Sequence, residues 1–213
     1  YTANCFRGSI VKLESHTEYE IRAELYNESD VQIGTLTQTV KTWNESPPIA
    51  KTVKLSEIYS GSGSLLLTNI KGSENGWIRL INDTNKSITG DKRCAEAVLI
   101  SDCEYLILDG VNISGGTRHG INITGSVKNI IVKNCDISNY GRAGIYNEDS
   151  NFYMLDGAYV DHDAGVYVCG AEKVTIDNCY IHDCNAYTND WGENVDTHPF
   201  GGIGICYMLN GQG

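Results

Sequence analysis

The sequence has little of what several large classes of protein need. Only 3 of its 213 residues are proline and 2 are methionine, and 16 basic residues face 27 acidic ones. The formal net charge of -11 argues against nucleic-acid binding, because affinity for phosphate backbones comes mostly from Lys and Arg. No apolar run approaches the roughly 18 residues of a membrane span, so none is expected. With 41% hydrophobic residues, the chain has enough apolar side chains for a sizeable core.

Cysteines and glycosylation sequons indicate the compartment. Eight cysteines are too few for a small disulfide scaffold and more than a cytosolic protein usually carries. No Cys-X-X-Cys pair occurs, so a thiolate metal site is not expected. Six Asn-X-Ser/Thr sequons predict N-glycans at Asn27, Asn44, Asn82, Asn85, Asn112 and Asn122. We therefore expect a secreted or cell-surface protein.

A repeat runs through the second half of the chain. The segments that align with one another are 106–114, 130–138, 152–161 and 174–182. With Leu108, Val132, Leu155 and Ile176 as equivalent positions, the periods are 24, 23 and 21 residues. A second strand is expected after each segment, at 120–123, 144–147, 165–168 and 202–205.

Apolar residues alternate with period two inside each repeat and are punctuated by Gly or Asn, which predicts three short strands separated by turns. Such a repeat cannot bury its apolar face alone, whereas stacking successive turns at about 4.8 Å gives a continuous core. The sequence therefore predicts an all-β parallel solenoid. One of its corners is expected at Gly110, Asn134, Gly157 and Asn178, where Gly and Asn accept a left-handed backbone.

The opening coils contain the patterns Tyr-Ser-Gly-Ser-Gly-Ser-Leu-Leu-Leu at 59–67, Trp-Ile-Arg-Leu-Ile at 77–81 and Tyr-Leu-Ile-Leu-Asp-Gly at 105–110. With the repeat, they resemble the right-handed parallel β-helix of the pectate lyase superfamily over about residues 49–213. Residues 1–48 alternate at 13–23 and 35–42 and end in Pro47-Pro48, and they resemble the second half of a fibronectin type III domain with a linker. We expect these two domains to be a piece of a longer extracellular chain, cut in mid-coil at its C-terminus.

The predicted coils leave the cysteine pairing open. Cys135 and Cys179 are expected to point inward two coils apart, roughly 9–10 Å, which is too far for a disulfide. Cys169 with Cys206 and Cys94 with Cys103 are alternatives, each of which either forms a disulfide or leaves free thiols.

The loop that precedes the last Gly-Ile strand is the expected functional loop. Gly165 to Gly202 spans 37 residues, and the excess falls within 185–200. The resemblance implies a substrate groove along the Gly-Ile strands, beside this loop. Stacking then predicts three side-chain columns at this edge: Ser114, Ser138, Asp161 and His182; Gly115, Asn139, His162 and Asp183; and Arg118, Arg142 and Asp163.

These columns suggest the binding of an acidic polysaccharide or a cell-surface glycan. Tyr146, Tyr167 and Trp191 are candidate sugar-stacking rings, and Arg118 and Arg142 are candidate partners for a uronate carboxylate. Lyase chemistry also needs a base and a cation. The catalytic candidates are His182, Arg142, Asp161 and His198, with His162 as another possible base. Asp161, Asp163, Asp183 and Asp196 are candidate ligands for Ca2+, which prefers oxygen donors.

Other interpretations fit the same residues. A hydrolase would use two carboxylates about 5 to 9.5 Å apart, such as Asp161 with Asp183 or Asp196. Asp, Asn, His and Ser also gather in turns simply because they hydrogen-bond the local backbone. The resembled lyases commonly use Lys or Arg as the base, and no Lys lies near the predicted groove. A non-enzymatic structural or adhesive module of a cell-surface or extracellular filament protein is the alternative function.

Overall fold

The computed structural model describes residues 9–42, 44–90, 94–141, 162–185 and 201–208. The chain divides into two compact units, residues 1–47 and 48–213. No helix among the described residues is long and apolar enough to cross a membrane.

In the first unit, β1 (Glu18–Tyr26) and β2 (Gln32–Lys41) form an antiparallel pair. The turn between them is organised by Asn27, whose Oδ1 accepts hydrogen bonds from the backbone N–H groups of Ser29 and Val31, both at 2.9 Å. These are the only strands among the described residues of this unit. The resemblance to a fibronectin type III domain therefore stays a prediction.

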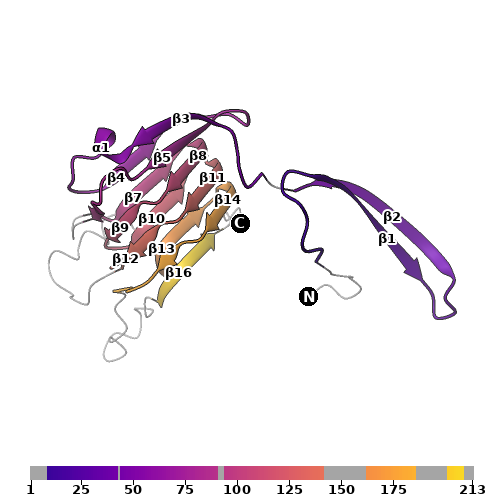
Figure 1. Ribbon diagram of the computed structural model, residues 1–213. Coiled ribbons are helices and arrows are strands. Elements are labelled where there is room, and N and C mark those ends of the chain that lie inside the picture. The colour runs from indigo at the N-terminus through magenta and orange to yellow at the C-terminus, as the bar shows by residue number, and fades with distance from the viewer. Residues whose placement is uncertain (1–8, 43, 91–93, 142–161, 186–200, 209–213) are drawn as a thin grey trace, which may run out of the picture. The chain divides into compact units, whose positions relative to one another are not determined.

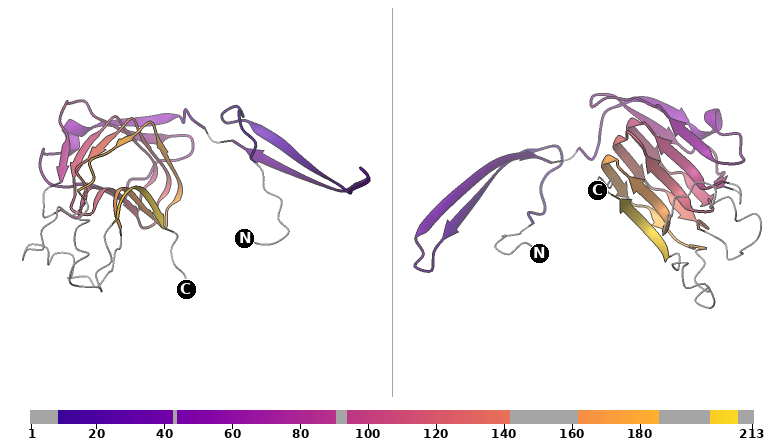
Figure 2. Two further views of the ribbon diagram at one scale, coloured as in Figure 1. Left: turned by 90° about the horizontal axis from the view of Figure 1, so that it is seen from below. Right: turned by 180° about the vertical axis from the view of Figure 1, so that it is seen from behind.

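The second unit is a stack of parallel β-coils (Figures 1 and 2). Its elements are β3 (Ile49–Lys54), α1 (Leu55–Ile58), β4 (Leu65–Thr68), β5 (Trp77–Ile81), β6 (Ile88–Gly90), β7 (Glu96–Ser101), β8 (Glu104–Asp109), β9 (Asn112–Gly115), β10 (His119–Thr124), β11 (Lys128–Lys133), β12 (Asp136–Ser138), β13 (His162–Cys169), β14 (Glu172–Asp177), β15 (Tyr180–Ile181) and β16 (Gly201–Met208). Successive coils place their strands in three parallel sheets, which we call the first (β4-β7-β10-β13-β16), the second (β3-β5-β8-β11-β14) and the third (β6-β9-β12-β15). The predicted solenoid with three strands per coil is confirmed.

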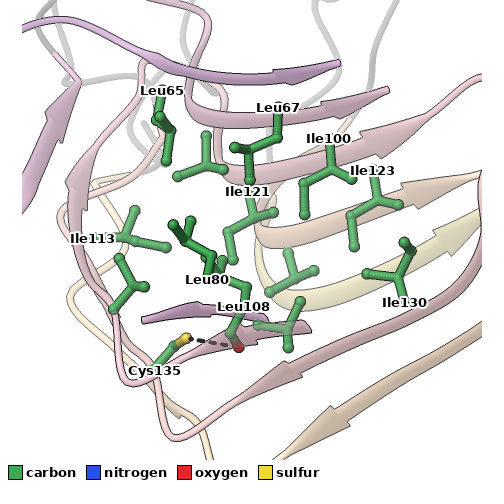
Figure 3. Packing of buried hydrophobic residues seen from close by; sticks show 14 of the residues in the cluster. Leu65, Leu67, Leu80, Ile100, Leu108, Ile113, Ile121, Ile123, Ile130 and Cys135 are labelled. Carbon is green, nitrogen blue, oxygen red and sulfur yellow. Dashed lines mark hydrogen bonds between the residues drawn. The ribbon is translucent and has the colours of Figure 1, made fainter. Parts of the chain in front are cut away.

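The core lies inside the coils, where the three sheets face one another (Figure 3). Ile123 of the first sheet, Leu108 and Val132 of the second and Ile137 of the third are all 0% exposed. Burying each such side chain contributes about 1.5–3 kcal/mol. At the N-terminal end, Leu55 of the short helix α1 belongs to the same buried cluster and is 2% exposed.

One predicted coil does not stand where the sequence repeat puts it. Val132 of β11 pairs directly with Ile176 of β14, and Ile121 of β10 pairs directly with Val166 of β13. No strand from 144–147 or 152–161 therefore lies between them, and the predicted period of 23 residues after Val132 is wrong. Both segments fall outside the described residues. In the sequence they are part of the connection between β12 and β13, residues 139–161.

The predicted corner is confirmed at its three described positions. Gly110, Asn134 and Asn178 have φ angles of 68°, 54° and 47°. The two Asn side chains form a ladder, since Asn178 Nδ2 donates to Asn134 Oδ1 and Asn134 Nδ2 donates to Asp109 Oδ1, both at 2.7 Å. Asp109 also forms an ion pair with Arg79 at 2.6 Å and is only 6% exposed. At this corner, side-chain hydrogen bonds therefore link adjacent coils in addition to the backbone hydrogen bonds of the sheets.

The cysteine column differs from the prediction as well. Because β11 and β14 are neighbours, and β12 and β15 are neighbours, Cys135 and Cys179 lie in adjacent coils and not two coils apart. Cys103 and Cys206 are free thiols. The two alternative disulfides, Cys94 with Cys103 and Cys169 with Cys206, are therefore not formed in this structure.

The glycines that open the strands of the first sheet give a test of the packing. A Cβ added to Gly120 would lie 2.5 Å from Ile137 Cγ2 and 2.7 Å from the carbonyl oxygen of Gly165, whereas at Gly204 it would meet nothing within 4 Å. We expect Gly120→Ala to lower the free energy of unfolding by about 1–3 kcal/mol, as overpacked cores do. Gly204→Ala, at the same position of a later coil, should change it by less than about 0.5 kcal/mol. Equal denaturation midpoints for the two variants would contradict this packing.

Candidate functional site

Five of the predicted site residues lie within the described part of the chain. They are Arg118, Asp163, Tyr167, His182 and Asp183. The other predictions, Arg142, Tyr146, Asp161, Trp191, Asp196 and His198, lie outside the described residues. Two groups of side chains can therefore be compared with the predictions, one on the outer face of the first sheet and one on the third sheet.

The outer face of the first sheet is shaped by a break in the inside–outside alternation of β10. A Cβ on Gly120 would contact Ile137 in the core, and the next residue, Ile121, is itself 0% exposed and part of the core. Two consecutive residues therefore face inward, although the pairing of β10 with β7 and with β13 keeps one register on both sides of Gly120. His119, the residue before this pair, is turned to the outer side of the sheet.

His119 stacks there on the ring of Tyr167 from β13. Their ring centroids are 4.4 Å apart and the rings are inclined by 12°. Tyr167 pairs in register with Asn122, whose Nδ2 donates a 3.2 Å hydrogen bond to Oε1 of Glu96 on β7. We call Glu96, Arg118, His119, Asn122 and Tyr167 the outer-face cluster. It draws on three neighbouring strands and the residue that precedes one of them.

Arg118 supplies the positive charge of this cluster. It lies directly before β10, and its carbonyl oxygen accepts a 3.2 Å hydrogen bond from the backbone N–H of Ala164 on β13. Burial raises the pKa of the Tyr167 hydroxyl, and the nearby Cys169 thiol adds to this rise, while the Arg118 guanidinium opposes it. Tyr167 is therefore a neutral hydrogen-bond donor at physiological pH.

Arg118 and Tyr167 were predicted from the sequence, and the structure brings them together. Glu96 and His119 were missed. The sequence feature that could have identified His119 is its position directly before a Gly-Ile pair. Strict period-two alternation, however, places His119 in the interior, because Ile121, two residues later, faces inward. The contribution of Glu96 depends on the pairing of β7 with β10, where Glu96 is in register with His119.

The predicted calcium ligands are only partly described. Asp163 is 0% exposed and lies next to Arg118 in the register of β10 and β13, whereas the side chain of Asp183 is 70% exposed beyond the end of β15. Within the described ranges, no three His, Cys, Asp or Glu residues gather in a way that holds a metal ion. The other two predicted ligands, Asp161 and Asp196, lie outside those ranges, and the Ca2+ site stays a prediction.

His182 directly follows β15, which belongs to the third sheet, whereas the outer-face cluster lies on the first sheet. Its Nδ1 is 2.9 Å from Oδ2 of Asp183, and its Nε2 is 3.0 Å from Oδ1 of Asp136 on β12. Its ring also stacks on Tyr180, with centroids 4.1 Å apart. Asp183, another of the predicted site residues, is therefore in contact with His182. The second contact is made by Asp136, because β12 and β15 are direct neighbours.

Two carboxylates on one imidazole favour its doubly protonated form. The hydrogen bond to Asp136, followed by that to Asp183, raises the pKa of His182. Both ring nitrogens are engaged, so neither has a lone pair directed at a substrate proton. This geometry suits a positively charged link between two coils better than a general base.

The sequons differ in how accessible their Asn side chains are. Asn27, Asn85 and Asn112 are exposed, and Asn44 and Asn82 are half-buried. Asn122 belongs to the outer-face cluster, and a glycan on its Nδ2 would displace the hydrogen bond to Glu96. N-glycosylation stays a prediction at these positions.

Comparison with known proteins identifies one family. A family model described as "Right handed beta helix region" matches residues 58–213. No curated protein matches the chain significantly, and no solved structure does either.

The pKa of His182 gives a test of the third-sheet group. A raised pKa in the folded state stabilises the protein fully below the unfolded value of about 6.5, and this stabilisation is lost as pH rises through the folded pKa. We expect the ring signals of His182 in an NMR titration to report a pKa above 6.5, and Asp136→Asn to lower it. The stability difference between the protein and His182→Gln should be larger at pH 6 than at pH 9. An unshifted titration would contradict the two hydrogen bonds.

Proposed function

Because the chain belongs to the right-handed beta helix family, we propose that it is an extracellular carbohydrate-active protein that binds an acidic polysaccharide on the outer face of the first sheet. The observation that carries this proposal is the outer-face cluster. An aromatic pair, a guanidinium, an amide and a carboxylate lie together on one side of adjacent strands. Family membership gives the scaffold, and the cluster gives the chemistry.

Each group in the cluster matches a part of a uronate sugar. The ring of Tyr167 offers an apolar face to the C–H groups of a sugar, while its hydroxyl donates a hydrogen bond. Arg118 recognises a carboxylate by a charge-assisted, bidentate pair. Nε of Arg118 and Oδ1 of Asn122 are buried and have no hydrogen-bond partner among the described residues. Both atoms therefore have hydrogen-bonding capacity that the described residues leave unused.

The repeat distance of the scaffold also suits a polymer. Neighbouring strands of a parallel sheet lie about 4.8 Å apart, so a ligand that crosses the strands contacts one coil after another. The cluster already extends over β7, β10 and β13. The long connections 139–161 and 182–200 re-enter the first sheet at β13 and β16, and they contain Arg142, Tyr146, Trp191 and His198. We include these four residues in the proposed binding region.

Cleavage would need two more functions, a base for the proton α to the carboxylate and a cation for the developing enolate charge. Arg142, Asp161 and His198 are the proposed sources of these functions. Ca2+ held by Asp161, Asp163, Asp183 and Asp196 would supply a Lewis acid and bridge an acidic protein to an acidic polymer. His182 fits the base role less well, since both of its nitrogens are bound to carboxylates.

Binding is the first test of this proposal. We expect Arg118→Ala and Tyr167→Ala to weaken the binding of polygalacturonate or alginate about tenfold or more, the effect of losing a charged hydrogen bond or a stacked ring. Tyr180→Ala is the matched control, because Tyr180 also stacks on a histidine but lies on the third sheet. Isothermal titration calorimetry on the folded variants measures the affinities. Equal affinities for all four proteins would contradict the assignment of the outer face.

Absorbance near 235 nm decides whether a bound polyuronate is also cleaved. A rise that EDTA abolishes and Ca2+ restores would mean β-elimination with a required cation. Binding without a rise, and without release of reducing ends, would make the protein a binding module. If no acidic or neutral glycan binds, the proposal fails and the structural or adhesive role takes its place.

A further inference from the structure

Cys135 and Cys179 occupy the same position in two adjacent coils. The residues before them, Asn134 and Asn178, are joined side chain to side chain at 2.7 Å. The backbone after them is paired as well, because the N–H of Tyr180 donates to the carbonyl oxygen of Cys135 at 2.9 Å. The register on both sides therefore leaves no offset between the two cysteines.

Their thiol groups also point the same way. Cys135 Sγ lies 3.2 Å from the carbonyl oxygen of Lys133, and Cys179 Sγ lies 3.3 Å from that of Asp177, in each case two residues earlier. Each thiol also reaches the preceding coil, at Leu108 O (Figure 3) and Val132 O respectively. Equivalent rotamers on strands about 4.8 Å apart fall within the range of Cα separations, about 4.4–6.8 Å, over which a disulfide forms.

The two sulfurs differ in environment, which sets an order for oxidation. Cys135 is 2% exposed, while Cys179 is half-buried. The hydrogen bond from Cys135 lowers the pKa of the Cys179 thiol, and the same bond together with burial raises the pKa of Cys135. Cys179 is therefore the more accessible sulfur and the one that carries thiolate.

We propose that Cys135 and Cys179 are a disulfide-forming pair that covalently links adjacent coils when the protein meets a small-molecule or protein disulfide. The Cys179 thiolate attacks one sulfur of that oxidant, forms a mixed disulfide and expels the oxidant's other half as a thiolate. Cys135 then loses its proton to solvent and attacks Cys179 Sγ, which expels the second half. Two protein thiols and one external disulfide thus become one protein disulfide and two external thiols.

The link would close a loop that contains the whole connection 139–161. It would join the coil of β10 to β12 to the coil of β13 to β15, the two coils that carry His119 and Tyr167. Constraining this loop lowers the entropy of the unfolded chain, so the oxidised protein should be the more stable form. This inference is independent of the proposed function, since it needs no glycan and no activity.

Peptide mapping tests the pair directly. The reduced full chain is equilibrated in mixtures of oxidised and reduced glutathione, trapped with N-ethylmaleimide and digested with trypsin and an enzyme that cleaves before Asp. The sequence then isolates Cys135 in the peptide 134–135 and Cys179 in 177–182, apart from the other cysteines. We expect these two peptides to be linked under oxidising conditions. Two alkylated thiols, or glutathione retained on Cys179, would overturn the proposal.

Thermal stability gives the second readout. Oxidation should raise the Tm by roughly 5–10 °C, and this rise should be absent in Cys135→Ala and Cys179→Ala. Cys103→Ala is the matched control: Cys103 is also a buried free thiol, but the next coil places Val127 beside it. It should keep the full rise. If the control loses the rise, or if either variant of the pair keeps it, the pair is not the source.

Discussion

The constraint on which this fold depends is the fixed register of its parallel ladders. Each coil repeats the backbone path of the one before it, so residues at equivalent positions become neighbours about 4.8 Å apart. Each side chain must therefore be compatible with the side chain at the equivalent position of the next coil. The interior satisfies this rule with columns of Ile, Leu and Val, and the corner at Asn134 and Asn178 satisfies it with an amide ladder. A single unsuitable residue would disturb the coils on both sides.

Local patterns predicted much of this architecture from the sequence. Period-two alternation located the strands, and left-handed turns were expected at Gly110, Asn134 and Asn178, where the φ angles are positive. The order of the coils was harder to predict, because the residues at 152–161 have the same apolar-Asp-Gly-apolar pattern as a true coil. A local pattern reports the propensity to form a strand but not which partner the strand pairs with. The direct pairing of Val132 with Ile176 is a non-local fact that the repeat alone did not contain.

The same distinction explains which site residues were predicted. Arg118 and Tyr167 were both expected at the outer edge of the Gly-Ile strands, but the repeat placed a further coil between them, whereas β10 and β13 pair directly. His119 was missed because Gly120 and Ile121 both face inward, which turns His119 outward against the alternation that the prediction used. Asp136 was missed as a partner of His182 because an extra coil was counted between β12 and β15. Asp136 became its neighbour once that coil was removed.

An error of one coil changes chemistry as well as topology. Two coils separate equivalent atoms by roughly 9–10 Å, a distance at which thiols do not react, whereas one coil brings them within reach of a disulfide. In a solenoid, the pairing register of the strands decides which side chains are close enough to react, and the number of residues between them in the sequence does not. The long connection 139–161 leaves this register intact, since β10 still pairs with β13 and β12 still pairs with β15. The spacing between the outer-face cluster residues on β10 and β13 is fixed by the ladder and not by the length of the connection. Residues can therefore be inserted between β12 and β13 without changing that spacing.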